Sequence, residues 1–373
     1  MAAPGSLTSA RAAEAAGVKA EPLEQLASVR DYVARNIRLI DIGLADLPLA
    51  SLSRPDETLT AGYASQPDRT ILIGAMLKAL GFEPEYVLAS GLPAVDGLEA
   101  ALQPAAPAVF TRLLVRVRVG RQAYWLGDSD QYAPLGVSAH AGLLALDARG
   151  RIFKLESAPG LSDRLDSRIT LRLKDDLAAE ITVERRYAGA YRASFVRGLK
   201  ESTPEERRRR HLEELAGIRR GARPLGQPAS QVDDKTATAR FALVCPDYAL
   251  RQGGLVYLDI YGLITRLGGV AAEIRTTPLL LATPLRRQTA ITIELPPGRL
   301  VSAPPALNLE LPGGRLTISS RWDAARHRLM IEQTIQNEAA LVSAEAYASL
   351  LQAQARLESP ELRCLIFEPA QTK

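Results

Sequence analysis

Apolar residues recur at three- and four-residue steps in several stretches, and this spacing predicts helices. One covers residues 21–36, where Leu26, Val29 and Val33 lie on a shared face. A second covers about residues 68–80 and is apolar nearly all round, which is typical of a buried helix. Gly81 follows it and is expected to end it. Two more are expected, one beginning with the capping sequence at residues 203–206 and one over residues 343–357.

Alternation of apolar and polar residues predicts strands over much of the remaining chain. Residues 112–119 and 122–126 alternate and are joined at Gly120-Arg121, which predicts an antiparallel hairpin. From about Ser167 onward, short alternating segments are separated by turn residues such as those at 296–298 and 312–314. Many short strands with such turns are typical of a β-sandwich. The polar stretch 221–235 is expected to be a loop.

These patterns predict an α+β protein with two domains. Residues 1–20 are expected to be a flexible N-terminal segment. Residues 21–150 should form a core of helices plus an antiparallel sheet. Residues 151–373 should form a mainly antiparallel β-sandwich domain with two inserted helices.

Charge changes this picture little, because 46 Lys and Arg are nearly balanced by 42 Asp and Glu in the 373 residues. The run Arg207–Arg210 resembles a nucleic-acid contact, but four consecutive helical residues point about 100° apart and cannot form one stripe. Glutamates flank the run at helical spacing, so a solvated helix face is favoured. We therefore expect no nucleic-acid partner, and an anionic-polymer binder remains an alternative.

Several other classes of protein lose support from composition. No apolar run is long enough for a membrane helix, and the N-terminus lacks the apolar core of a signal peptide. The three histidines show no ligand spacing, so we expect no metal and no cofactor. Cys245 and Cys364 lie in strand-like runs and are interpreted as buried thiols, although a disulfide remains open.

The segment Thr58–Leu88 has the pattern of a loop, a buried helix, a glycine and a strand. The start of such a helix is a suitable position for a cysteine nucleophile, because it lowers the pKa of the thiol. Leu59, Tyr63 and Asp68 occur at the spacing found in the bacterial transglutaminase-like domain, a papain-related cysteine fold. The segment resembles that family. In the family the nucleophilic Cys precedes the helix, and in this register its position falls on Gln66.

The resemblance also implies positions for the other two members of the family's catalytic triad. The strand that carries the base opens here as Phe110-Thr111-Arg112, so the His position falls on Arg112. The orienting Asp position, counted back from Ala133-Pro134-Leu135-Gly136, falls on Gly127. Asp128 is one residue away, which in a strand points to the opposite face. Arginine stays protonated and glycine has no side chain, so the resemblance implies a triad that has been lost.

The C-terminal half extends the resemblance, with Leu295-Pro296-Pro297-Gly298, Tyr347 in a late helix and a final strand at residues 362–367. Similar bacterial proteins pair the core with a β-sandwich and are exported to the periplasm or cell surface. The resemblance covers about residues 23–367. It implies a cell-envelope location, with a cytoplasmic one as the alternative.

Three functional hypotheses follow. The first is a catalytically inactive binding or scaffold module whose vestigial cleft holds Gln66, Arg112, Gly127 and Asp128. In it, Tyr63, Asp68, Arg112 and Trp125 would contact a protein, peptide or envelope-polymer partner. The second is an enzyme with altered chemistry, in which Asp68 or Asp128 acts as acid or base. The third is the anionic-polymer or nucleic-acid binder.

Overall fold

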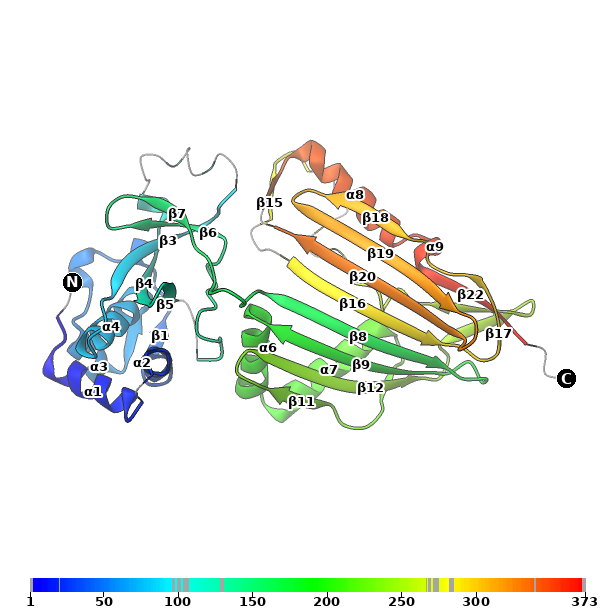
Figure 1. Cartoon of the computed structure of the whole chain (residues 1–373), viewed down its shortest axis with the longest axis horizontal. Helices are drawn as coiled ribbons and strands as arrows, with labels where there is room; N and C mark the ends of the chain where they lie inside the picture. Colours follow the sequence, from blue (N-terminus) through cyan, green and yellow to red (C-terminus); the bar gives the residue numbers. More distant parts are fainter. Residues whose placement is uncertain are drawn as a thin grey trace. The chain divides into compact units, whose positions relative to one another are not determined.

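The chain forms an α+β structure with two compact units (Figure 1). The computed structural model describes residues 3–19, 21–95, 98, 102, 107–127, 131–265, 267, 270, 275–281, 285–338 and 340–370. The first unit comprises residues 1–162 and 192–194, and the second comprises residues 163–191 and 195–373. The first unit thus extends past the boundary expected at residue 150, because strands over residues 143–154 complete its sheet.

The first unit combines helices with a five-stranded antiparallel sheet. Its helices are α1 (Ser6–Ala16), α2 (Pro22–Asn36), α3 (Pro55–Ala61) and α4 (Gln66–Ala79), with short 3-10 turns at Leu44–Asp46, Leu49–Ser51 and Pro107–Val109. The sheet has the order β5-β4-β3-β6-β7, from β3 (Glu85–Pro93), β4 (Arg112–Val119), β5 (Gln122–Leu126), β6 (Leu143–Asp147) and β7 (Ile152–Lys154). A separate parallel pair joins β1 (Arg38–Ile40) to β2 (Tyr63–Ser65). The hairpin predicted from alternation is confirmed as β4–β5.

The N-terminal segment expected to be flexible is largely helical, so that prediction is wrong for residues 6–16. Thr8, Ala12 and Ala16 recur every four residues and are buried on one face of α1. Gly5 offers no side chain to cap the helix, and Asp56 of α3 accepts from the backbone N–H of Thr8 at 2.9 Å instead. A capping group supplied from another helix cannot be read from local sequence.

Helix α4 is the buried helix predicted by the apolar run. Leu72, Ile73 and Met76 share a core cluster with Val115 and Val117 of β4. Gly81, with φ of +88°, ends the helix, and the backbone N–H of Phe82 donates to the carbonyl of Leu77 at 3.0 Å. One face of the sheet therefore packs on α4.

The second unit is β-rich and mainly antiparallel. Its large sheet has the order β10-β12-β9-β8-β16-β20-β19-β18, and β11 also pairs with β12. These strands are β8 (Arg164–Leu173), β9 (Ala179–Ala188), β10 (Arg223–Pro224), β11 (Ala229–Val232), β12 (Thr236–Cys245), β16 (Leu285–Glu294), β18 (Leu307–Leu311), β19 (Gly314–Asp323) and β20 (Arg328–Asn337). A four-stranded sheet, β13-β14-β22-β17, contains β13 (Ala249–Gln252), β14 (Leu255–Asp259), β22 (Cys364–Pro369) and β17 (Gly298–Ser302). A further pair joins β15 (Leu279–Leu281) to β21 (Ala340–Val342).

Two details of the β-rich region differ from the sequence prediction. Helices α7 (Pro204–Ile218) and α8 (Ala344–Leu357) were expected, but α6 (Ala190–Glu201) and the short α9 (Pro360–Arg363) were not. The stretch 221–235 is not a loop throughout, since it holds β10 and β11. Both strands are short and exposed, so they lack the alternation that marks a half-buried strand.

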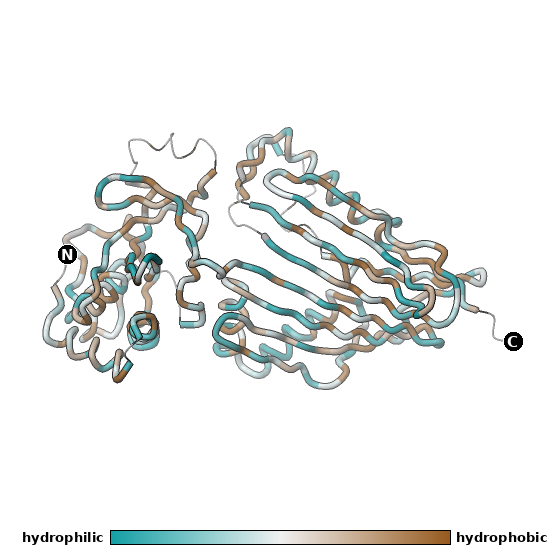
Figure 2. The backbone as a smooth tube through the Cα atoms, viewed as in Figure 1, coloured by the Kyte–Doolittle hydropathy of each residue, from teal (hydrophilic) through white to brown (hydrophobic). Residues whose placement is uncertain are grey.

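A single core cluster contains residues of both sheets together with α7, α8 and α9. Every second residue of β8 (Ile169, Leu171 and Leu173) enters this core, and the residues between them face outward. Figure 2 shows hydrophilic (teal) and hydrophobic (brown) residues following one another along the strands of the large sheet. The alternation expected for these segments is thus confirmed in β8, with the apolar residues inward.

Both cysteines are free thiols, with Cys245 buried and Cys364 partly buried. Burial raises the pKa of each thiol. Within the described residues, no helix combines the length and apolar character needed to span a membrane.

Candidate functional site

The start of helix α4 is the place where the sequence suggested a lost catalytic group. Ser65 caps the helix by accepting from the backbone N–H of Asp68 at 3.3 Å. The hydroxyl of Ser65 donates back to Oδ2 of Asp68 at 2.7 Å, and the backbone N–H of Ser53 donates to Oδ1 at 2.8 Å. Asp68 is 6 % exposed, and these hydrogen bonds use both of its carboxylate oxygens to hold the start of the helix.

Gln66 is the first residue of α4, and its side chain is 7 % exposed. Its amide nitrogen Nε2 donates to the carbonyl of Leu113 on β4 at 2.7 Å and to Oγ1 of Thr70 at 3.1 Å. These two acceptors use both amide hydrogens, which places Oε1 on the other side of the group. Oε1 is buried and has no hydrogen-bond partner. The amide therefore ties the helix to the strand and offers no nucleophile.

Thr70 and Gly127 complete the packing around Gln66. Thr70 Oγ1 lies 3.0 Å from the carbonyl of Gln66 and 3.2 Å from that of Leu113. Gly127 has a φ of +104°, and a Cβ placed on it would lie 2.7 Å from Thr70 Oγ1. The position that the resemblance gives to the orienting Asp is thus in contact with the start of α4, where space for a side chain is missing.

Arg112 does not join this group. It opens β4 and is exposed, and it lies two residues from Leu114. Leu114 packs with Val87 and Trp125, whereas Val115 packs with α4. Because side chains alternate along a strand, Arg112 lies on the sheet face opposite α4. The structure brings Gln66 and Gly127 together and leaves Arg112 apart from them.

Trp125 also lies on the face of the sheet away from α4. Its ring stacks on Phe153 with centroids 5.8 Å apart, and its Nε1 donates to the carbonyl of Glu156 at 2.9 Å. The guanidinium of Arg116 lies 5.9 Å from the ring centroid. With these contacts and burial, Trp125 has the environment of a core residue.

Tyr63 is the most exposed of the aromatic side chains suggested for binding, at 56 %. It begins β2, which leads directly into α4, and it pairs with Arg38 of β1. The same strand pair exposes Leu39 and Ile40, and Ile42 follows it. Exposed apolar residues therefore adjoin the start of α4.

Two charged side chains, Asp68 and Arg69, stand in the first turn of α4. Burial lowers the pKa of Arg69, which stands in the first turn beside Asp68. Asp128 lies outside the described residues. Within the described part of the chain, no group of three or more His, Cys, Asp and Glu is placed to hold a metal ion.

The arginine run on α7 makes contacts near its own helix. Arg207 donates to the carbonyls of Leu199 and Ser202, each at 2.8 Å. Arg209 lies 3.7 Å from Glu213, one helical turn away. The Arg209–Glu213 pair has the helical salt-bridge spacing that the flanking glutamates predicted.

Comparison with known proteins gives a likeness of fold. No protein-family model matches the chain, and no curated protein matches it by sequence. A crystal structure from Parabacteroides distasonis is similar to it, with a TM-score of 0.54 and 14 % identity over 98 % of this chain. That protein is described as a "putative protease", and the chain spans 55 % of its length. At this identity the likeness concerns the fold alone.

Sequence reasoning missed two members of the Gln66 group, Thr70 and the carbonyl of Leu113. Thr70 had a readable signal, since it lies four residues after Gln66 and so on the same helix face. The carbonyl of Leu113 had none, because a backbone group is identified by tertiary contact and not by residue type.

Proposed function

We propose that this chain is a catalytically inactive binding module built on a transglutaminase-like fold. The observation that carries the proposal is the state of Gln66. At the start of α4, where such a fold needs its nucleophile, a buried amide is hydrogen-bonded to Leu113 and Thr70. An amide has no lone pair basic enough to attack a carbonyl, and Asp68 is committed to the helix cap.

Two further observations support an inactive site. Gly127 contacts Thr70 at the position of the orienting carboxylate, and Arg112 lies on the other face of the sheet. The likeness of fold to a protein described as a "putative protease" is consistent with a scaffold from which hydrolytic chemistry has been lost. The proposal extends to a bacterial cell-envelope location, on the resemblance alone.

The binding role is supported by the apolar surface at β1 and β2. Leu39, Ile40, Ile42 and Tyr63 are exposed at the entrance to α4. Exposed apolar groups gathered on neighbouring strands commonly mark a contact with another molecule. The partner class that fits is a protein or extended peptide with apolar side chains.

Catalysis can be tested by incubating the full chain with fluorescein-labelled casein, with and without a dansylated primary amine. We expect neither proteolysis nor amine incorporation. Gln66→Cys is the informative variant: position 66 is 7 % exposed, so we expect its thiol to alkylate as slowly as a buried thiol, whereas an accessible thiol at a helix start would alkylate quickly. The native thiols, whose pKa values are raised by burial, should alkylate slowly and serve as internal controls. Turnover by the wild-type chain that disappears in Asp68→Asn would overturn the proposal in favour of altered enzymatic chemistry.

Binding can be tested on an array of extended peptides with alternating apolar residues. We expect retention that is lost in Tyr63→Ser and Leu39→Ser. Leu250→Ser, at a leucine on β13 that is 63 % exposed against 47 % for Leu39, is the control and should retain binding. Equal loss in all three variants would show non-specific adhesion and refute a site at β1–β2.

A further inference from the structure

The large sheet of the second unit contains a parallel pair, β8 and β16, within otherwise antiparallel neighbours. Both strands run toward the same end of the sheet, where Arg172 lies opposite Glu294. Beyond this point β8 turns back into β9, while β16 leaves for β17 in the four-stranded sheet. The two connections therefore diverge and leave a crevice at the carboxyl ends of β8 and β16.

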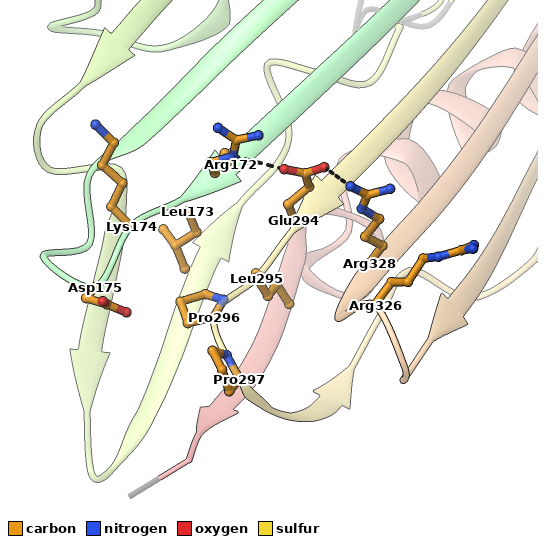
Figure 3. A pocket seen from close by; sticks show the side chains of 10 residues that line it. All are labelled: Arg172, Leu173, Lys174, Asp175, Glu294, Leu295, Pro296, Pro297, Arg326 and Arg328. Atoms are coloured by element: carbon orange, nitrogen blue, oxygen red, sulfur yellow. Dashed lines mark hydrogen bonds and ion pairs between the residues drawn. The ribbon is translucent and has the colours of Figure 1, made fainter. Parts of the chain in front are cut away.

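A pocket of about 560 Å³ opens at this crevice (Figure 3). Its apolar lining is formed by Leu173 at the end of β8 and by Leu295, Pro296 and Pro297 after β16. Proline fixes φ, and the backbone N–H of Leu295 donates to the carbonyl of His327 at 3.0 Å. This part of the pocket is therefore held in place before any ligand arrives.

The charged lining is predominantly cationic. The lining holds four cationic side chains, Arg172, Lys174, Arg326 and Arg328, and two anionic ones, Glu294 and Asp175. Lys174 and Arg326 also pair with anions outside the pocket, Glu180 and Asp323. Such pairs between exposed side chains are weak and exchange readily.

Glu294 bridges the two arginines that stand at the pocket (Figure 3). Its Oε2 lies 2.9 Å from Nε of Arg172, and its Oε1 lies 2.8 Å from Nη2 of Arg328. A guanidinium has five N–H donors, so most of them remain for another acceptor. The side chains of Arg172 and Arg328 are 64 % and 46 % exposed, against 18 % for Glu294. One carboxylate thus positions two accessible guanidinium groups, one at each of its oxygens.

We propose that this pocket binds a small phosphate monoester. The phosphate would lie on Arg172 and Arg328, since arginine forks bind such oxyanions through paired hydrogen bonds. A monoester carries roughly −1.5 to −2 charges at neutral pH and has oxygens enough to contact both arginines, whereas a carboxylate carries one charge. The organic part would lie on Leu295, Pro296 and Pro297. This site does not depend on the function proposed for the first unit.

The outward face of the sheet argues against an extended polyanion. Away from the pocket, Glu184 lies between Arg240 and Arg168 and pairs with both, at 2.8 Å and 4.0 Å. This triplet repeats the Arg–Glu–Arg pattern without the apolar lining of the pocket. Here too a carboxylate separates the two arginines, so these described residues do not form a continuous cationic track, and the triplet provides a matched control.

The test is an amide NMR titration of the full chain with phenyl phosphate at low salt. We expect saturable shifts at residues 173–175 and 326–328, with tighter binding than for inorganic phosphate or benzoate. Arg172→Gln and Arg328→Gln should each weaken binding about three- to fivefold, the effect of one screened charge. Glu294→Gln should tighten it by a similar factor, because the resident carboxylate no longer competes. Arg240→Gln should leave it unchanged.

Other outcomes would overturn the proposal. Shifts that do not saturate, or equal weakening in Arg240→Gln, would show general attraction to a charged surface. Benzoate binding as tightly as phenyl phosphate would exclude the dianion as the recognised group. Weaker binding in Glu294→Gln, with an unchanged spectrum elsewhere, would refute competition at the two arginines.

Discussion

Gly127→Ala is predicted to destabilise the first unit more than an ordinary glycine replacement. Gly127 has a φ of +104°, and a new Cβ would lie 2.7 Å from Oγ1 and 3.1 Å from Cγ2 of Thr70. A side chain in left-handed backbone costs about 1–2 kcal/mol, and overpacking adds about 1–3 kcal/mol. The free energy of unfolding should therefore fall by about 2–5 kcal/mol.

Gly81→Ala is the matched control for the backbone cost. Gly81 also has a positive φ, of +88°, but nothing lies within 4 Å of a Cβ placed there. It should lose about 1–2 kcal/mol, so that the difference between the two variants isolates the clash with Thr70. In a Thr70→Ala background the clashing atoms are gone. There, Gly127→Ala should lower the free energy of unfolding only by the backbone cost of about 1–2 kcal/mol.

The assay is urea unfolding followed by tryptophan fluorescence. The chain has two tryptophans, Trp125 in the first unit and Trp322 in the second, so a Trp322→Phe background makes Trp125 the reporter. If Gly127→Ala and Gly81→Ala lose the same stability, Gly127 does not pack against α4. The closed environment inferred for Gln66 would then be wrong as well.

Three further predictions can be measured by urea unfolding, the first two with Trp125 as the reporter and the third with Trp322 as the reporter in a Trp125→Phe background. Asp56→Ala should cost about 1 kcal/mol, because α1 loses the acceptor for Thr8. The hydrogen bond from Thr8 holds the pKa of Asp56 below its ordinary value. The stabilisation by Asp56 is therefore complete above about pH 4 and is lost as pH falls through the folded-state pKa. If Asp56→Ala cost the same free energy of unfolding at low pH, this reasoning would be wrong. Ser65→Ala should cost about 1 kcal/mol by removing the cap of α4, and no change would show that the cap is dispensable. Tyr248→Phe should cost about 1–2 kcal/mol in the second unit, since it removes the 2.9 Å hydrogen bond from a buried hydroxyl to the carbonyl of Asp259; a neutral effect would mean that water replaces it.

Helix α4 shows how far a local pattern reaches. The apolar run predicted a buried helix near residues 68–80, and the helix begins two residues earlier, at Gln66. Ser65 caps it and Pro67 stands in its first turn, both of which are local signals. The fate of the Gln66 amide is not local, because its acceptor on Leu113 is 47 residues away.

The strand that carries Arg112 shows a different limit. Alternation over residues 112–119 predicted which residues share a face, and the structure confirms that alternation for 114, 115 and 117. Alternation alone does not say which face meets a helix. Packing of Val115 and Val117 on α4 made that choice, and it placed Arg112 on the opposite face.

By itself, the sequence determined the α+β class, the buried helix with the glycine that ends it and the alternating strands of the β-rich region. It also has no Cys near the start of that helix. These follow from periodicity, residue type and turn chemistry, each contained within a few neighbouring positions. The tertiary structure alone decided that Asp56 caps α1, that Gln66 is bonded to Leu113, and that β8 and β16 run parallel to form a pocket. Each of these joins residues far apart in the chain, and their pairing depends on how whole elements pack.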